Sequence, residues 1–263
     1  MRNIAIGLIR ISPLLNIWSI INSPKLFFVV NNPIEYIVYL LNPKKTLLIS
    51  VNSPIGKFRL ELRNRSTARV FYSLFIREDY KIKNTSKNFL DVGSNIGISA
   101  SYFLSRNYDN RIITVEPDPN NIIFLRKNLD QSKFRGRFKI IEKAIDNKKG
   151  NQKLSIIENG VYTSLVKKQA NLNNILDVEV ITFDELMQNF SFFDPTLPIV
   201  LKLDIEGAEE RVLESINFRK YNSIRMIILE KDEVNLNEDG FQYLLNKNIN
   251  YKERNGLIII IKF

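Results

Sequence analysis

The sequence predicts an α/β fold with a doubly wound, mostly parallel sheet of seven strands and an antiparallel hairpin at one edge. Strand-like and helical patterns alternate from residue 88 onward, which is typical of parallel sheets. Apolar runs such as "IIT", "IVL" and "MIIL" are continuous, as expected for strands covered on both faces. The closing runs "YKER" (251–254) and "GLIIIIKF" (256–263) flank Asn255-Gly256, which favours a hairpin turn.

The first 45 residues are predicted to form an apolar extension in front of the sheet. Pro13, Pro24 and Pro33 interrupt it, so no membrane-spanning helix of about 20 residues is expected. No small-residue cleavage site follows it, which disfavours a signal peptide. It is interpreted either as one or two short helices packed on the main domain or on a second copy of the chain, or as a segment resting on a membrane. The membrane anchors would be Trp18, Arg2, Arg10 and Lys25.

Residues 46–87 are predicted to form a cap made of a hairpin and a helix. The strand-like runs "TLLISV" (46–51) and "KFRLELR" (57–63) flank the turn-like "NSPIG", and "RVFYSLFIREDY" (69–80) indicates a short helix. The third predicted domain is then residues 88–263.

Five parallel strands and five helices are expected in this third domain. The strands are "NFLDVG" (88–93), "RIITVEP" (111–117), "FKIIEKAI" (138–145), "PIVLKLDI" (198–205) and "SIRMIILEKD" (223–232). The helices are 96–106, 118–129, 183–190, 209–216 and 240–248. Asp118 is the predicted N-cap of the second helix, with Pro119 at its first position. "QKLSII" (152–157) and "VEVITF" (178–183) are predicted to form a side ribbon around the polar loop 158–175.

Composition removes several kinds of chemistry. The chain has no cysteine and no histidine, which excludes disulfides, thiolate nucleophiles, Ser-His-Asp triads and histidine metal sites. Proton transfer is left to Asp, Glu, Lys, Tyr or water. The net charge of +10 raises the question of nucleic-acid binding, but the lysines are spread along the chain without an Arg-rich run. A solvated basic surface is the favoured interpretation, while an acidic substrate or an anionic membrane surface stays open.

The loop "DVGSNIG" lies where an open sheet of this kind binds its ligand, beyond the carboxyl end of the first strand. A dinucleotide fingerprint needs glycines at 93, 95 and 98, and this chain has Gly93, Asn95 and Ile98. No Walker lysine follows, so a phosphate ligand is disfavoured. Glu116 stands 23 positions after Gly93, near the separation of about 20 at which an acid binds ribose hydroxyls.

An adenosine that carries an amino acid instead of phosphate fits these residues. Gly93 and Gly97 keep the turn tight, Asp91 could face an ammonium group, and Glu116 could bind the ribose. This set indicates S-adenosylmethionine as the cofactor.

The motifs "FLDVGSNIG", "VEPDP", "KNL" and "LKLDIEGAEERVL" are similar to those of the FkbM-type methyltransferases, from about residue 70 to 232. This family is a branch of the class I S-adenosylmethionine-dependent enzymes, which have a Rossmann-like fold. The resemblance implies contacts between the methionyl part and Asp91, Gly93, Ser94, Asn95 and Gly97. It also implies that Glu116, followed by Pro117, holds the ribose and that the stretch around Ala144 lines the adenine. Ser94 replaces the alanine that is usual in the family.

The run "LKLDIEGAE" carries the candidate catalytic residues. Lys202 and Asp204 lie on the same side of a strand, because side chains alternate with a period of two. Asp204 then lies at the carboxyl end, and Glu206 starts the following turn. Asp204 or Glu206 is the predicted base for a hydroxyl nucleophile, or the two could share a divalent cation, although no metal site is predicted. Lys202 would tune or neutralise this cluster. Glu209 and Glu210 are explained by the helix dipole.

The predicted function is methylation of a hydroxyl. "LDIEG" is not the Asn/Asp-Pro-Pro-aromatic motif that amino-directed nucleic-acid enzymes of the class usually carry. The resemblance suggests a sugar, glycolipid or polysaccharide precursor as the acceptor. Two alternatives stay open: a nucleic-acid-binding or RNA-modifying protein, and a non-catalytic component at a membrane surface. A cytoplasmic location is expected, with peripheral membrane contact through residues 1–45 and a homo-oligomer as open questions.

Overall fold

The computed structural model describes most of the cap and of the sheet domain. It covers residues 20, 23–43, 46–80, 82, 85, 87–156, 163–164, 175–205, 207–230, 250–254 and 257–261. The predicted helix 240–248, the Asn255-Gly256 turn and most of the loop 158–175 lie outside the described residues.

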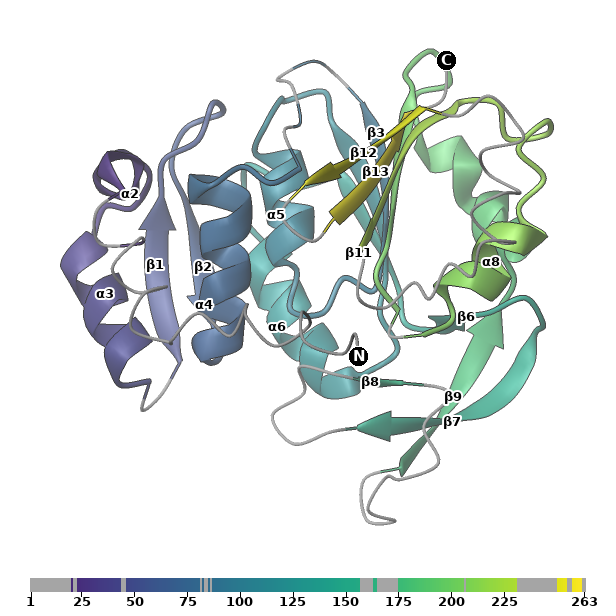
Figure 1. Ribbon diagram of the computed structural model, residues 1–263, viewed down its shortest axis with the longest axis horizontal. Coiled ribbons are helices and arrows are strands. Elements are labelled where there is room, and N and C mark those ends of the chain that lie inside the picture. The colour runs from purple at the N-terminus through teal and green to yellow at the C-terminus, as the bar shows by residue number, and fades with distance from the viewer. Residues whose placement is uncertain are drawn as a thin grey trace, which may run out of the picture.

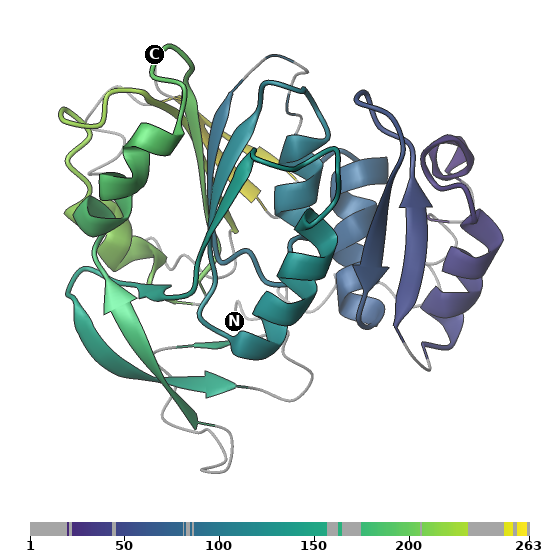
Figure 2. The same ribbon diagram turned by 180° about the vertical axis from the view of Figure 1, so that it is seen from behind.

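The main sheet has the predicted doubly wound topology (Figures 1 and 2). Its order, over the described residues, is β12-β13-β11-β10-β3-β4-β5. The parallel strands are β3 (Asn88–Val92), β4 (Arg111–Val115), β5 (Phe138–Ile141), β10 (Ile199–Leu203) and β11 (Ile224–Glu230). The antiparallel edge is β12 (Asn250–Arg254) with β13 (Leu257–Ile261). Strand order reverses between β3 and β10, the position at which such sheets bind ligands.

Helices cover both faces of this sheet, as the continuous apolar runs predict. α5 (Ile98–Leu104) and α6 (Pro119–Leu129) lie on one face, and α7 (Phe183–Leu186) and α8 (Glu209–Ser215) on the other (Figure 1). The side chains alternate accordingly: Phe89 of β3 packs in the cluster of α5 and α6, and Leu90 packs in the cluster of α7 and α8. The predicted N-cap of α6 is confirmed, since the Asp118 side chain accepts the Asn120 N–H at 2.8 Å.

A second, smaller sheet branches off after β5. It contains β6 (Ala144–Ile145), β7 (Gly150–Ile156), β8 (Thr163–Ser164) and β9 (Ile175–Ile181) in the order β6-β9-β7-β8. The antiparallel pairing of β7 with β9 confirms the predicted side ribbon. The prediction of one strand over 138–145 is wrong: β5 ends at Ile141, and Ala144 pairs with Val180 of β9 instead. Apolar residues occur on both sides of the break, in β5 and in β6, so the hydrophobic pattern could not reveal it.

The described part of the predicted extension packs with the predicted hairpin cap in one buried cluster, and the two together are called the cap from here on. The extension contributes α2 (Pro24–Val29) and α3 (Pro33–Leu41). The hairpin part contributes β1 (Leu47–Val51), β2 (Phe58–Leu62), α4 (Arg65–Phe71) and the π-helical segment η1 (Tyr72–Ile76). The predicted β1–β2 hairpin is confirmed. The helix after it begins at Arg65, earlier than the predicted start at Arg69. The reason is a capping box, in which the side chains of Asn64 and Thr67 bind each other's backbone N–H groups.

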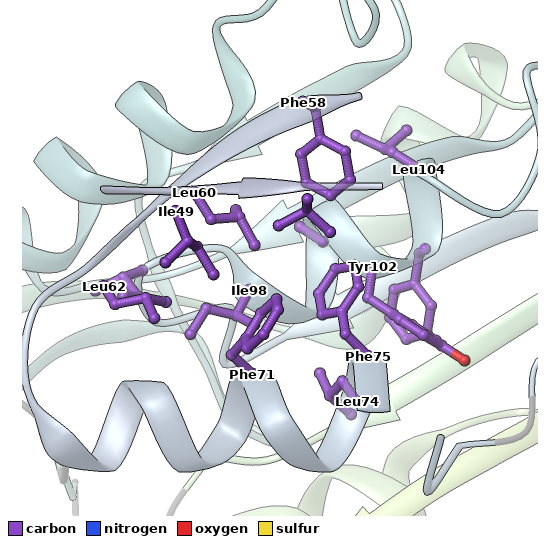
Figure 3. Packing of buried hydrophobic residues seen from close by; sticks show 14 of the residues in the cluster. Ile49, Phe58, Leu60, Leu62, Phe71, Leu74, Phe75, Ile98, Tyr102 and Leu104 are labelled. Atoms are coloured by element: carbon purple, nitrogen blue, oxygen red, sulfur yellow. The ribbon is translucent and has the colours of Figure 1, made fainter. Parts of the chain in front are cut away.

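Aromatic side chains join the cap to α5 (Figure 3). The rings of Phe71 and Phe75 stack at 4.9 Å, and Phe75 meets Tyr102 of α5 edge-on at 5.2 Å. The cap and this face of the sheet therefore share one buried cluster.

The outer side of the cap is apolar as well, with Phe28 76% and Ile34 73% exposed. No helix in the described part of the chain is long and apolar enough to cross a membrane.

Side-chain amides from α6 and from the turn after it occupy the free edge of β2. The Asn128 side chain accepts the Glu61 N–H at 2.7 Å and donates to the Glu61 carbonyl at 3.2 Å. Gln131 does the same for Arg59, at 2.8 and 2.7 Å. Asn128 also donates to the carbonyl of Ile96 at 2.8 Å, so one amide ties the hairpin to the loop that follows β3. The backbone groups of this edge are thereby satisfied without another strand.

Replacing Tyr36 with phenylalanine tests whether α3 is part of the core. The Tyr36 hydroxyl is buried and donates to the Ala68 carbonyl at 2.7 Å, so Tyr36→Phe should lower the free energy of unfolding by about 1–2 kcal/mol in urea denaturation. Tyr108→Phe is the matched control, because its hydroxyl makes a 2.7 Å bond to Ile55 on a side chain that is 59% exposed. It should change stability by less than about 0.5 kcal/mol. Equal losses in both variants would contradict the burial of α3.

Candidate active site

A cavity opens at the carboxyl ends of β3, β4 and β10, where the strand order reverses. Most of the residues predicted for the site line it: Gly93, Ser94, Asn95, Glu116, Pro117, Ala144, Lys202 and Asp204. The side sheet contributes further walls through Ile145 and Leu154, and α4 through Ser66 and Val70. Asp91 and Gly97 lie behind this lining, and Glu206 lies outside the described residues.

The loop after β3 owes its shape to two glycines and to Asn95. Gly93 and Gly97 have φ angles of +80° and +83°, and Asn95 has φ +48°. A Cβ on Gly93 would lie 1.7 Å from the carbonyl oxygen of Asp204, so this glycine is required where β3 and β10 approach each other. A Cβ on Gly97 would lie 2.6 Å from a methyl carbon of Leu125, which is the movable end of a side chain, so the positive φ angle is the stronger reason for glycine at this position. A backbone contact at Gly93 and the backbone conformation at Gly97 therefore explain both glycines, in addition to any ligand.

Glu116 presents a buried carboxylate to the cavity. Its side chain accepts the Asn95 N–H at 2.8 Å on one oxygen, and the Asp118 N–H at 3.0 Å and the Asn121 amide at 3.1 Å on the other. Burial raises the pKa of Glu116 to about 7, although these three donors act in the opposite direction. A carboxylate has about four acceptor directions, so capacity remains for a hydroxyl donor in the cavity.

Lys202 links the two acids on either side of the strand reversal. Its ammonium lies 2.9 Å from Asp204, 3.4 Å from Asp91 and 2.9 Å from the Gly93 carbonyl. The predicted pairing of Lys202 with Asp204 on one side of β10 is thus confirmed. Asp91 is fully buried and also accepts the Ser99 hydroxyl at 2.6 Å. It therefore reaches the cavity only through Lys202 and Ser99, both of which line it.

Burial and pairing set the charges of this cluster. Burial lowers the pKa of Lys202, but the Asp204 and Asp91 carboxylates outweigh it, and the pKa stands well above its usual value. Burial raises the pKa of Asp91, while Lys202 and Ser99 oppose that change. Lys202 is consequently a permanent cation that compensates two acids, and it cannot serve as a base at neutral pH. Asp204 is the more accessible acid, with a side chain that is 25% exposed.

Several site residues were missed in the sequence. Ser66, Thr67 and Val70 line the cavity from α4, and Tyr80 lines it beside them. The Asn64–Thr67 capping box was a signal for the start of α4, but no local pattern shows which face of a helix meets a cavity formed by later strands.

Glu209 also has a role beyond the helix dipole. Its buried carboxylate accepts the N–H groups of Ile205 at 2.7 Å and Gly207 at 2.8 Å, which fixes the backbone after Asp204. An acid in the first turn of a helix was the available signal.

No group of three acids is placed to hold a metal ion among the described residues, which do not include Glu206.

Replacing Lys202 with methionine should destabilise the fold by about 3 kcal/mol, because it leaves the Asp91 carboxylate buried without its cation. Loss of that cation raises the pKa of Asp91 further, so the variant should regain stability as the pH falls and Asp91 becomes protonated. Denaturation of Lys202→Met at several pH values measures both effects. Lys139→Met, at an exposed lysine bound to Asn189, is the control. A Lys202→Met variant as stable as the parent would contradict this account.

Solved structures of methyltransferases are similar in outline. Methyltransferase FkbM from Methylobacillus flagellatus KT matches at 15% identity and TM-score 0.49, covering 73% of this chain and 48% of the other. A putative caffeoyl-CoA O-methyltransferase from Staphylococcus aureus matches at 16% identity and TM-score 0.41, covering 67% and 76%. TrmK from M. capricolum, in complex with S-adenosylhomocysteine, matches at 11% identity and TM-score 0.39, covering 71% and 66%. This chain thus spans about half the length of the FkbM structure.

The family is established by a family model. TM-scores under 0.5 do not establish a shared fold, and the comparison with curated proteins gave no match. The model of the methyltransferase FkbM domain, however, matches residues 91–252, which is more than half of the chain. The match begins at Asp91 and includes the cavity loop, Glu116 and the Lys202–Asp204 pair. This chain belongs to the FkbM methyltransferase family, a branch of the S-adenosylmethionine-dependent enzymes.

Proposed function

We propose that this protein is an S-adenosylmethionine-dependent O-methyltransferase that methylates a hydroxyl of a sugar, glycolipid or polysaccharide precursor. The observation that carries the proposal is the convergence of two acids on one cavity. Glu116 enters it from the end of β4, and Asp204 enters it from the end of β10. One acid suits a ribose, and the other suits an acceptor hydroxyl.

The residues around the cavity fit the cofactor. Glu116 has acceptor capacity for a ribose hydroxyl, and Pro117 follows it in the lining. Gly93, Ser94 and Asn95 offer a compact backbone turn for the methionyl part, and Ala144 opens a flat, apolar side for the adenine. When bound, this cofactor supplies an electrophilic methyl group on a sulfonium. Asp91 lies behind the lining, and of its two partners only Ser99 could accept from the ligand ammonium, because its hydroxyl donates to Asp91 and keeps its oxygen free as an acceptor.

Asp204 is the proposed base. A hydroxyl is a weak nucleophile, so its proton must be accepted as the oxygen attacks, and Asp204 is the described acid that is both accessible and at the cavity. Lys202 holds the Asp204 carboxylate in place through the 2.9 Å ion pair. The alignment of the acceptor oxygen with the methyl group supplies further rate enhancement. Glu206 is the alternative base.

A hydroxyl-rich acceptor is supported by polar side chains in the lining of the cavity. Ser66 and Ser99 offer hydroxyl oxygens, and Lys143, which also binds Glu179, offers an ammonium from the start of the side sheet. Such groups can bind the several hydroxyls of a sugar, whereas a purely apolar wall could not. The family resemblance favours the same acceptor class.

Cofactor binding should depend on pH through Glu116. Only the ionised carboxylate keeps acceptor capacity for a ribose hydroxyl beside its three protein donors, and its pKa of about 7 means that protons compete with the ligand below neutrality. Isothermal titration with S-adenosylhomocysteine should give an affinity that falls up to about tenfold per unit as the pH drops below 7. Glu116→Gln should bind weakly at every pH and lose this dependence. Absence of binding, or an unchanged Glu116→Gln variant, would contradict the assignment.

Replacing Asp204 with asparagine should slow methyl transfer and spare cofactor binding. The loss of a base typically costs about 100-fold or more in turnover. Transfer of a labelled methyl group to extracted glycans measures the rate, and calorimetry with S-adenosylhomocysteine measures the binding. Asp130→Asn, at an exposed acid after α6, is the control. Normal turnover by Asp204→Asn would reject Asp204 as the base and leave Glu206.

A further inference from the structure

We infer that Arg63, at the end of the β1–β2 hairpin, is a positioning residue for Glu116: through Asn121 it holds the carboxylate ready to accept a ligand hydroxyl. The inference rests on the proposed role of Glu116 in binding the ribose. Arg63 lies outside the matched family region of 91–252, so it belongs to the part of the chain that precedes the domain.

Two hydrogen bonds connect the hairpin to the cofactor carboxylate. The Arg63 guanidinium donates to the Asn121 side-chain oxygen at 3.0 Å, and the Asn121 side-chain nitrogen donates to Glu116 at 3.1 Å. Asn121 and Glu116 are both buried, with 1% and 3% of their surfaces exposed. Water therefore offers little competition for these bonds, and each is stronger than it would be at the surface.

Arg63 decides which end of the Asn121 amide faces Glu116. A guanidinium can only donate, so the amide must turn its oxygen toward Arg63 and its nitrogen toward the carboxylate. Without Arg63 the amide could turn its oxygen toward Glu116, where two acceptors would repel each other. The orientation of one buried amide thus transmits the position of the hairpin to the site.

The position of Arg63 is itself well fixed. Its backbone N–H donates to the Thr67 hydroxyl at 3.1 Å, in the capping box that starts α4. Its guanidinium lies over the Phe124 ring of α6, at 5.6 Å from the centroid. Arg63 is therefore held by the hairpin, α4 and α6 at once, and Thr67 of α4 lines the same cavity.

Arg63 also contributes charge. Burial lowers the pKa of Arg63, and the nearby Asp118 and Glu116 carboxylates act in the opposite direction, so the cation and these acids attract one another. By the same attraction Arg63 favours the ionised form of Glu116, whereas Asp118 disfavours it. Among the described residues, the other titratable groups that face the cavity are Tyr80, Lys143, Lys202 and Asp204. They remain in place when Arg63 is replaced, so a change in the pH dependence of binding reports on Arg63.

The test is the pH midpoint of S-adenosylhomocysteine binding, measured by calorimetry on the full chain. Arg63→Met should move the midpoint upward by about one unit, because the amide loses its orientation and Glu116 loses a nearby cation. Affinity at pH 7 should then fall about fivefold. Arg63→Lys retains the charge, so its pH midpoint should lie close to that of the parent.

Arg65→Met is the matched control. Arg65 stands two positions further along the chain and donates to the Leu41 carbonyl at 2.8 Å. The substitution removes an arginine from the same corner of the cap, and it should leave the pH midpoint unchanged. Asn121→Leu should reproduce the shift of Arg63→Met, and Arg63→Met should add less to Asn121→Leu than to the parent.

The outcomes separate this inference from the proposed function. A parent protein that does not bind S-adenosylhomocysteine would overturn both. The role of Arg63 alone would be overturned by a different result. In that case the parent binds with a pH midpoint that Glu116→Gln abolishes, but Arg63→Met leaves that midpoint unchanged. An equal shift in Arg65→Met would overturn it too, since the effect would then be a general loosening of the cap. If Arg63→Met does not fold by circular dichroism, Arg63→Lys and Asn121→Leu decide the question.

Discussion

The buried ammonium of Lys202 is the interaction on which the rest of the site depends. It stands at the reversal of strand order, where β3 and β10 diverge toward different helices, and it binds Asp91 of one strand and Asp204 of its own. Two carboxylates this close would otherwise repel each other and spread the strands apart. The same cation binds the Gly93 carbonyl, so it holds the loop and both acids together. The chemistry of the cavity is therefore built into the centre of the sheet.

Periodic and local features were predictable from the sequence. The alternation of Phe89 and Leu90 between two faces, the Asp118 cap and the side-by-side placement of Lys202 and Asp204 follow from helix and strand geometry alone. The loop at Gly93 and the acid at Glu116 could be located because their spacing along the chain reflects the fixed lengths of strand, turn and helix.

Long-range features were not predictable in the same way. The break between β5 and β6 is not visible in the sequence because apolar residues occur on both sides of it, in β5 and in β6. The burial of Asp91 behind Lys202 depends on the packing of β10, which lies more than 100 residues later in the chain. The approach of α4 to the cavity is set by the aromatic cluster of Phe71, Phe75 and Tyr102 and by no local motif. The sequence motifs located the site, whereas the residues behind and around it, such as Asp91 and those of α4, were found only in the structure.

The amides that cover the outer edge of β2 have a consequence for self-association. An uncovered edge strand offers its N–H and C=O groups to the strands of other molecules, which leads to exchange of segments or to fibres. Asn128 and Gln131 satisfy those groups, yet a side-chain amide has no continuing backbone along which a further strand could pair. The helix that carries Asn128, and that ends just before Gln131, also carries Asn121 beside Glu116. This helix and the turn after it thus close the β2 edge of the small sheet to pairing with a neighbouring copy.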